Sequence, residues 1–187
     1  MTTSKLETQV DAERSVVTSD GAYGRFQGAL DWGLAAGARY GGASDAFAGV
    51  IATSIHFFTL AGVYGAWQES FEPEPEELRR SFSVGASLKP LFLLRWSKDL
   101  EHGPAVADLA LDSFALGLGA RIANIDGSYT TGVETSLGAG IPLFAKAGGP
   151  WLELGAALVF LERREPIAEV VATLAWHQWF EGRWLFD

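Results

Sequence analysis

Polar and apolar residues alternate with a period of two along most of this chain. Between Arg25 and Tyr40 the even positions are apolar, whereas the odd positions hold every charge of the segment and several small residues. Such alternation is typical of a β-strand with two unlike faces. The segment is far longer than the usual strand of about five or six residues. Its apolar face must therefore lie against an extended apolar environment, and lipid is one candidate.

The same alternation recurs in five further parts of the sequence. In each of them Leu, Phe, Val, Ile or Trp occupies one set of alternate positions, and Gly, Ser, Ala and scattered charges occupy the other. The five segments are 82–96, 113–122, 133–143, 152–160 and 170–176. In the segment 82–96, Pro90 lacks a backbone donor and therefore requires a bulge or an irregular position. The recurrence indicates a chain built almost entirely of strands.

A stretch from 46 to 70, without a charge before Glu69, is more ambiguous. Its apolar phase is odd at first and becomes even near Phe57 and Phe58, which predicts one very long strand with a β-bulge at that point. Two tightly joined strands are the alternative, but the residues His56 to Thr59 are not typical of a turn.

The connections between these segments favour an antiparallel arrangement. They are about five to twelve residues long, which suits antiparallel neighbours and leaves little room for parallel crossovers. Residues 1–20 form a polar tail without periodicity and without the apolar core of a signal peptide. We therefore predict an all-β domain over 21–187, an antiparallel up-and-down barrel of about eight strands.

The sizes of the side chains indicate which face of the barrel points outward. An eight-stranded barrel has an interior just wide enough for side chains to fill it, so the small residues and few charges fit inside. The Leu, Phe and Trp positions then form the outer face, as in a transmembrane β-barrel. A soluble lipocalin-like barrel that binds a small apolar ligand is the alternative. A helical membrane protein is another, because 46–67 has the length of a membrane-spanning helix, but the period of two elsewhere opposes it.

Two sets of candidate residues follow from this orientation. The polar phase predicts a lumen-facing network that mixes both signs of charge, composed of Arg25, Asp31, Arg39, Lys89, Arg121, Glu134, Glu153, Glu169 and His177. Unpaired buried charge is costly, so these residues are expected to pair and plug the lumen, with conduction as the second possibility. Aromatic residues predict a girdle at the membrane boundaries, made of Trp32, Tyr40, Trp67, Trp96, Trp151, Trp176, Trp179 and Trp184.

Composition narrows the function classes. The net charge of −9 argues against nucleic-acid binding, since phosphate contacts need clustered Lys and Arg. Cysteine is absent, which excludes disulfides and thiolate metal sites. The 22 Gly and 7 Trp agree with a β-structure whose exterior is apolar.

These alternating segments and aromatic positions resemble the small outer-membrane β-barrels of Gram-negative bacteria. The resemblance covers nearly everything after residue 20, and it implies a cell outer-membrane location, contact with the lipid bilayer, and a structural, adhesive or narrow-pore role. The chain departs from that family in showing no signal sequence and in following Phe186 with Asp187.

Candidate chemistry is sparse. The histidines are His56, His102 and His177, and none has the neighbours that a metal site needs, so we expect neither a metal nor a cofactor. Some outer-membrane barrels are lipid-modifying hydrolases that pair a His with a Ser, but no Ser stands near His177 in its own segment. An enzyme is therefore a third and weaker hypothesis. The loops 71–80 and 97–108 are the expected contacts for an envelope protein partner.

Overall fold

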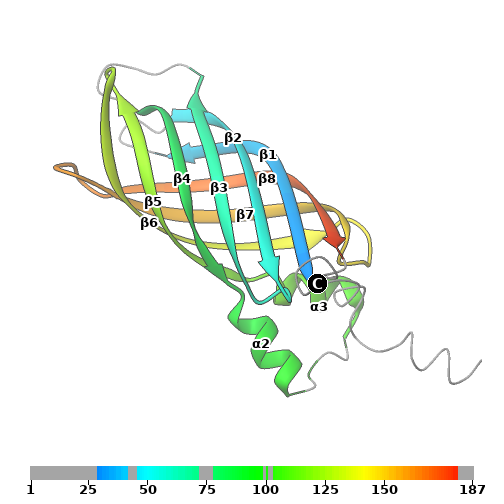
Figure 1. Ribbon diagram of the computed structural model, residues 1–187. Coiled ribbons are helices and arrows are strands. Elements are labelled where there is room, and N and C mark those ends of the chain that lie inside the picture. The colour runs from blue at the N-terminus through cyan, green and yellow to red at the C-terminus, as the bar shows by residue number, and fades with distance from the viewer. Residues whose placement is uncertain (1–28, 42–45, 72–77, 99, 101–102, 181–187) are drawn as a thin grey trace, which may run out of the picture.

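A computed structural model describes residues 29–41, 46–71, 78–98, 100 and 103–180. Eight strands form a closed barrel in which each strand pairs with the next and β8 pairs with β1, all antiparallel (Figure 1). The strands are β1 (Leu30–Gly41), β2 (Ala46–Phe57), β3 (Ala61–Ser70), β4 (Leu78–Leu88), β5 (Ala115–Ile125), β6 (Ser128–Pro142), β7 (Gly149–Leu161) and β8 (Ile167–Phe180). The prediction of an all-β up-and-down barrel is confirmed.

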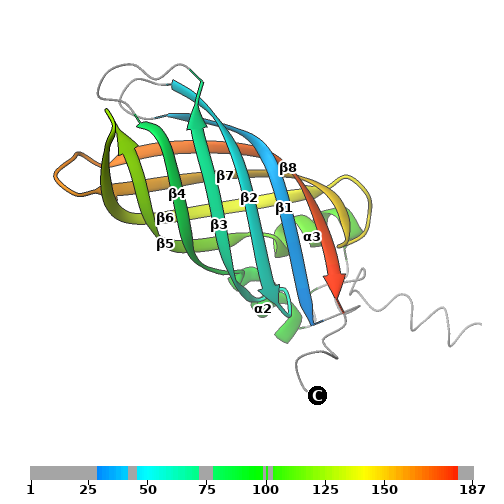
Figure 2. The same cartoon turned by 45° about the horizontal axis from the view of Figure 1, so that its top comes forward.

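The two ends of the barrel differ. At one end β1 begins and β8 finishes, and there the β4–β5 connection folds into two helices, α2 (Pro90–Ser97) and α3 (Ala105–Asp112) (Figures 1 and 2). We call this the helical end. The opposite end, the hairpin end, carries the turn at Asp126 and Gly127 and the short connection 162–166. Neither of the described helices has the length and apolar character needed to cross a bilayer.

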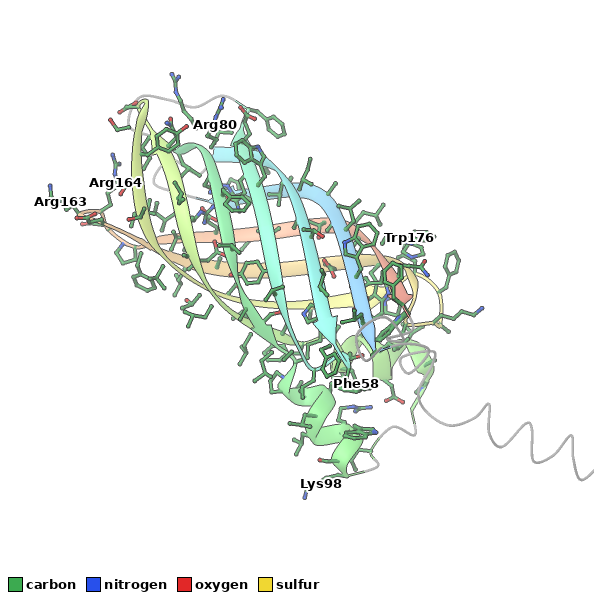
Figure 3. The ribbon with its side chains drawn as sticks, viewed as in Figure 1. Phe58, Arg80, Lys98, Arg163, Arg164 and Trp176 are labelled. Atoms are coloured by element: carbon green, nitrogen blue, oxygen red, sulfur yellow. The ribbon has the colours of Figure 1, made fainter. Side chains whose placement is uncertain are left out.

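The outer surface of the barrel is apolar along its length. Side chains such as Ile51, Leu118 and Leu174 are 57–60% exposed on the wall (Figure 3). Among the described strand positions, the only outward-facing charges lie at the hairpin end, where Glu69 pairs with Arg80 at 3.0 Å. Removing that much apolar surface from water needs an apolar environment around the barrel. The predicted outward orientation of the apolar face is therefore confirmed.

The stretch 46–70 is two strands, so the prediction of one bulged strand is wrong. Phe58 and Thr59 take φ of 47° and 60°, and the Leu60 N–H donates to the Phe57 carbonyl at 3.0 Å. Positive φ at both central residues is typical of a type I′ hairpin turn. The turn was missed because Phe and Thr rarely adopt this conformation. Ile51, Ile55, Val63 and Trp67 all face outward, so the outward phase stays odd through both strands.

The segment 82–96 is also not one strand, as the alternation had predicted. The strand β4 ends at Leu88, and Pro90 opens the helix α2. Proline suits the first turn of a helix, because its missing N–H would have no intrahelical partner there. The loop expected at 97–108 likewise contains the start of α3. The other strand segments appear near their expected positions. The predicted tail 1–20 lies outside the described residues.

Candidate functional site: the barrel lumen

The predicted lumen residues that the structure describes all point into the barrel. Asp31, Arg39, Lys89, Arg121, Glu134, Glu169 and His177 are buried, and Glu153 is half-buried. Arg25 lies outside the described residues. The side chains separate into two clusters, which we call the ion-pair cluster and the histidine cluster.

Arg121 is the centre of the ion-pair cluster. Its guanidinium Nη1 donates to Glu169 at 2.8 Å and to Glu134 at 3.2 Å. The remaining nitrogens donate to Ser81 Oγ, from Nη2 at 2.9 Å and from Nε at 3.1 Å, and Nη2 also donates to Gln68 Oε1. The side chain has no exposed surface, since its relative accessibility is 0%. One guanidinium therefore joins β3, β4, β6 and β8 across the lumen.

The rest of the ion-pair cluster balances this charge. Arg39 pairs with Glu169, and Glu134 accepts hydrogen bonds from Ser83 at 2.9 Å and from Tyr64 at 3.2 Å. Two arginines therefore face two glutamates, and each carboxylate is hydrogen-bonded, as a buried charge requires. Between this cluster and the hairpin end lies an apolar layer, formed by Ala123, Ile125, Val159 and Leu161.

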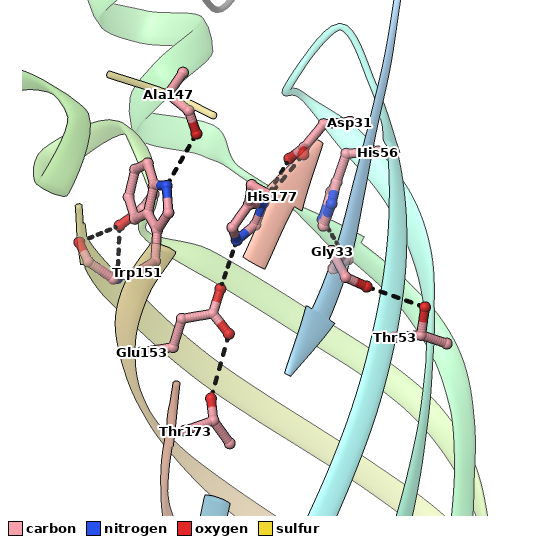
Figure 4. A network of polar contacts seen from close by, with 12 residues as sticks. Asp31, Gly33, Thr53, His56, Ala147, Trp151, Glu153, Thr173 and His177 are labelled. Carbon is pink, nitrogen blue, oxygen red and sulfur yellow. Dashed lines mark hydrogen bonds and ion pairs between the residues drawn. The ribbon is translucent and has the colours of Figure 1, made fainter. Parts of the chain in front are cut away.

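The histidine cluster lies nearer the helical end, with the His177 ring between two carboxylates (Figure 4). His177 Nδ1 is 3.0 Å from Asp31 Oδ1, and Nε2 is 3.0 Å from Glu153 Oε1. Since ionised carboxylates only accept hydrogen bonds, both ring nitrogens must donate, and the ring is then cationic. Lys89 Nζ is 4.0 Å from Asp31, at the limit of an ion pair. The two cations His177 and Lys89 thus balance the two carboxylates of this cluster, as the two arginines balance the two glutamates of the ion-pair cluster.

A cavity of about 280 Å³ adjoins the histidine cluster. The cavity reaches Glu134 and Gln68 of the ion-pair cluster at one end and Leu109 of α3 at the other. Three buried polar atoms on its wall have no hydrogen-bond partner among the residues that the structure describes, namely His56 Nδ1, Thr59 Oγ1 and Trp179 Nε1. A cavity of this volume has room for several waters, and water can satisfy such atoms. This part of the lumen is therefore roomy, and its few polar atoms lie on a wall that is otherwise formed mainly by apolar residues such as Ala35, Val50 and Leu109.

The helix α3 covers the mouth of the lumen at the helical end. Leu109 is 2% exposed and packs with Ala35, Ala175 and Trp151 from the barrel interior. The Trp151 indole donates to the Ala147 carbonyl at 2.9 Å, and Ser113 Oγ donates to the Gly140 carbonyl at 3.0 Å. The packing of Leu109 and the Ser113 bond hold α3 in the mouth and against β6, whereas the Trp151 bond ties β7 to the connection between β6 and β7.

Arg95 fastens α2 to α3. Its guanidinium pairs with Asp108, and Nε donates to Asp112 at 2.9 Å. Burial alone would lower the pKa of the Arg95 guanidinium, but the two carboxylates outweigh this effect and raise the pKa above its ordinary value. The two helices are therefore tied by a charge-assisted contact.

The predicted aromatic girdle divides into outward and inward residues. Tyr40, Trp67 and Trp176 are exposed on the wall, and Trp32 is half-buried, with its indole donating to Thr53 at 3.0 Å. The girdle assignment is wrong for Trp151 and Trp179, because both occupy inward positions and pack in the lumen. Trp96 is exposed but lies on α2, away from the barrel wall. Trp184 lies outside the described residues.

Several lumen residues were not predicted from the sequence. Ser81 and Ser83 are uncharged, yet their polar phase was the signal that could have identified them. Gln68 and Tyr64 fell on the phase that was expected to be apolar, but both point inward, Gln68 to Arg121 and Tyr64 to Glu134. Arg95 and Asp108 could not be found, because that part of the chain was expected to be strand and loop.

One His–Ser pair among the described residues bears on the enzyme hypothesis. His56 Nε2 lies 2.8 Å from Ser87 Oγ, but this pair faces the lumen cavity and not the lipid side of the wall. Within the described part of the chain, the other ring nitrogen, Nδ1, has no partner of the kind that orients the imidazole of a catalytic base. His102 lies outside the described residues. Within the described ranges, no group of three or more His, Asp or Glu side chains is placed to hold a metal ion.

Comparisons with known proteins add a likeness of fold. No family model and no curated protein matches this chain. Neisserial surface protein A (NspA) is similar with a TM-score of 0.44 and 12% identity, covering 81% of this chain and 97% of that one. Ail, the attachment invasion locus protein of Yersinia pestis, is similar with a TM-score of 0.40 and 10% identity, and the likeness covers 80% of this chain and 96% of Ail. Neither similarity bears on the function of this chain. The resemblance to small outer-membrane barrels is confirmed at the level of architecture, by the closed eight-stranded barrel itself.

Proposed function

We propose that this protein is an integral outer-membrane barrel with a structural role, and that its lumen is closed to ions. The observation that carries the proposal is the Arg121 network, which joins four strands across the lumen with no exposed guanidinium surface.

The outer surface supports the membrane location. Its apolar positions and exposed aromatics match what a bilayer requires of a barrel exterior, and a soluble ligand-binding barrel would leave the same surface in water. Closed antiparallel barrels suit a membrane, because every backbone hydrogen bond along the wall is made between strands. A barrel of this kind belongs in the outer membrane of a Gram-negative cell.

The side chains that occupy the lumen favour a closed barrel over a conducting pore. A conducting pore needs a continuous water path, and here the ion-pair cluster and the apolar layer beside it occupy the interior toward the hairpin end. At the helical end Leu109 fills the mouth. An adhesive role and a protein partner at 71–80 or 97–108 remain predictions, and the residues 72–77, 99, 101 and 102 lie outside the described part of the chain.

The experiment compares the wild type, in planar lipid bilayers, with a variant in which Arg121, Glu134, Leu161 and Leu109 are all replaced by Ala. We expect no conductance steps from the wild type and discrete steps from the variant, because the substitutions remove one cation and one anion from the centre of the lumen and shorten the side chains of the apolar layer and of the mouth. Folding of each sample is checked by its heat-modifiable migration in detergent gels.

Two results would contradict the proposal. Conductance steps from the folded wild type would show an open pore and favour the narrow-pore role. A chain that stays monodisperse without detergent and does not enter vesicles would favour the soluble ligand-binding barrel instead.

A further inference from the structure

The lumen cavity has a polar end, which is set by the pairing of the strands. One row of paired residues crosses the barrel from β8 to β4 near the helical end, and we call it the polar row. It consists of Trp179, Asp31, His56, Gly62 and Ser87, and all of these except the glycine line the cavity. Figure 4 shows Asp31 and His56 beside His177 inside the barrel.

Four polar side chains at this end have hydrogen-bonding capacity that no described residue uses. His56 and Thr59 are 5% and 6% exposed and line the cavity, yet His56 Nδ1 and Thr59 Oγ1 have no partner there. The same holds for Trp179 Nε1. Lys89 Nζ has only its contact of 4.0 Å with Asp31. Because the indole and the ammonium group can only donate, this end favours an occupant that accepts hydrogen bonds.

The other end of the cavity is apolar, because four alanines meet there. They are paired side by side on β8, β1, β2 and β3, and we call them the alanine row, which consists of Ala175, Ala35, Ala52 and Ala66. All four line the cavity. Methyl groups leave space that larger side chains would fill, and they offer no hydrogen bonds. Ordered water needs about two to four polar partners, so the alanine row suits an apolar group better than water.

The distance between the two rows limits the length of an occupant. On β1 the polar row is at Asp31 and the alanine row is at Ala35, and the separation is also four residues on β2, β3 and β8. At about 3.3 Å per residue the rows are about 13 Å apart, which an alcohol with a chain of about eight carbons can span. The cavity volume of about 280 Å³ is close to the lower end of the range for ligand pockets, about 300–1,000 Å³. The occupant must therefore be small.

The charge balance of the lumen selects a neutral occupant. In the histidine cluster the cations His177 and Lys89 balance the carboxylates of Asp31 and Glu153, and the ion-pair cluster is balanced within itself. A charged ligand would leave one buried charge without a counter-charge, which is costly. The oxygen of a hydroxyl or carbonyl group accepts hydrogen bonds without adding a charge.

We propose that the lumen cavity binds a small neutral amphipathic molecule, with an oxygen acceptor at the polar row and an apolar chain against the alanine row. Ligand binding goes beyond the proposed structural role and is compatible with it. The ion-pair cluster and the apolar layer separate the cavity from the hairpin end, so a lumen that holds this ligand is still closed to ions.

The test uses 1-octanol as the probe and NMR spectroscopy of the full chain, refolded into deuterated micelles at a series of octanol concentrations. The indole N–H of Trp179 reports on the polar row, and that of Trp176, exposed on the outer wall, reports on octanol dissolved in the micelle. We expect the Trp179 signal to move and saturate, whereas the Trp176 signal moves without saturation. At equal concentration in the micelle, octane should bind about tenfold more weakly, because its hydrogen bond is missing.

A matched pair of variants locates the apolar chain. Ala52→Phe fills the alanine row, whereas Ala36→Phe adds the same ring on the outer face of the neighbouring strand. We expect the saturable shift of Trp179 to be lost in the first variant and kept in the second. A wild-type Trp179 signal that moves without saturation, as Trp176 does, would overturn the proposal, and so would equal saturation in the two variants. If Ala52→Phe does not fold, Ala66→Phe fills the same row.

Discussion

The two clusters in the lumen contain similar side chains but differ in packing. In the ion-pair cluster, Arg121 and Glu169 are almost fully buried and joined at 2.8 Å, and Ser81, Ser83 and Gln68 add further hydrogen bonds, although Arg39 Nε has no partner among the described residues. In the histidine cluster, Lys89 is 4.0 Å from Asp31, and a cavity of about 280 Å³ lies alongside. Charge balance is therefore achieved in two ways, by direct contact in the ion-pair cluster and beside a cavity with room for several waters in the histidine cluster.

The difference assigns separate roles to the two halves of the lumen. Where charges touch and exclude water, removing one partner leaves an uncompensated buried charge, which is strongly destabilising. Where a cavity lies beside the charges, water can replace a lost partner at lower cost. The ion-pair cluster should thus determine stability and closure, whereas the histidine cluster should tolerate change.

The largest effect is expected from Arg121→Ala. Glu169 would keep Arg39 as its cation, whereas Glu134 would keep only the hydrogen bonds from Ser83 and Tyr64, so we expect the free energy of unfolding to fall by about 3–5 kcal/mol. Denaturant unfolding in detergent micelles, followed by the heat-modifiable gel shift, measures the change. The control Arg163→Ala removes an exposed arginine from the hairpin end and should leave stability unchanged. Equal stability of the two variants would show that the ion-pair cluster does not hold the barrel together.

A smaller effect is expected from His177→Ala. The substitution removes the donor from both Asp31 and Glu153, but water from the cavity can reach these carboxylates, so we expect a loss of about 2 kcal/mol. The same unfolding measurement applies, with Gln178→Ala on the outward face of β8 as the control. A loss as large as that of Arg121→Ala would mean that water does not compensate in this cluster, and the contrast between the clusters would fail.

The smallest effect is expected from Lys89→Met. Asp31 keeps its hydrogen bond to His177, the lysine contributes only a contact of 4.0 Å, and water from the cavity can reach Asp31, so the loss should stay below about 1 kcal/mol. Lys98→Met, at the exposed C-terminal end of α2, is the matched control. If Lys89→Met lowered the free energy of unfolding more than His177→Ala does, Lys89 would be the main cation of the histidine cluster. Its contact with Asp31 would then have to be shorter than 4.0 Å.

The strand pattern was readable from the sequence because alternation is local. Leu118 and Arg121 follow opposite phases of one strand, and the structure places Leu118 outside and Arg121 inside, as the phase requires. The errors occurred where local geometry breaks the pattern. Phe58 and Thr59 adopt positive φ, and Pro90 converts an apparent strand into a helix. A period of two can arise by chance over a short apolar helix such as α2.

The contacts within the lumen could not be read from the sequence. Arg121 meets Glu169 across 48 positions, and Asp31 meets His177 across 146, through the closure of β8 on β1. These pairings depend on the relative register and tilt of strands around the barrel, which no single segment contains. The same holds for Trp151 and Leu109, which come together only because α3 folds back over the mouth.

The sequence by itself determined that the chain forms long antiparallel strands with an apolar outer face and charges inside, since side-chain direction in a strand depends only on position parity. The tertiary structure alone decided which charges pair, where water has room, and that α2 and α3 gather at one end. The physical reason is that closure brings residues far apart in the sequence into contact, and a buried charge is stable only beside the partner that closure supplies.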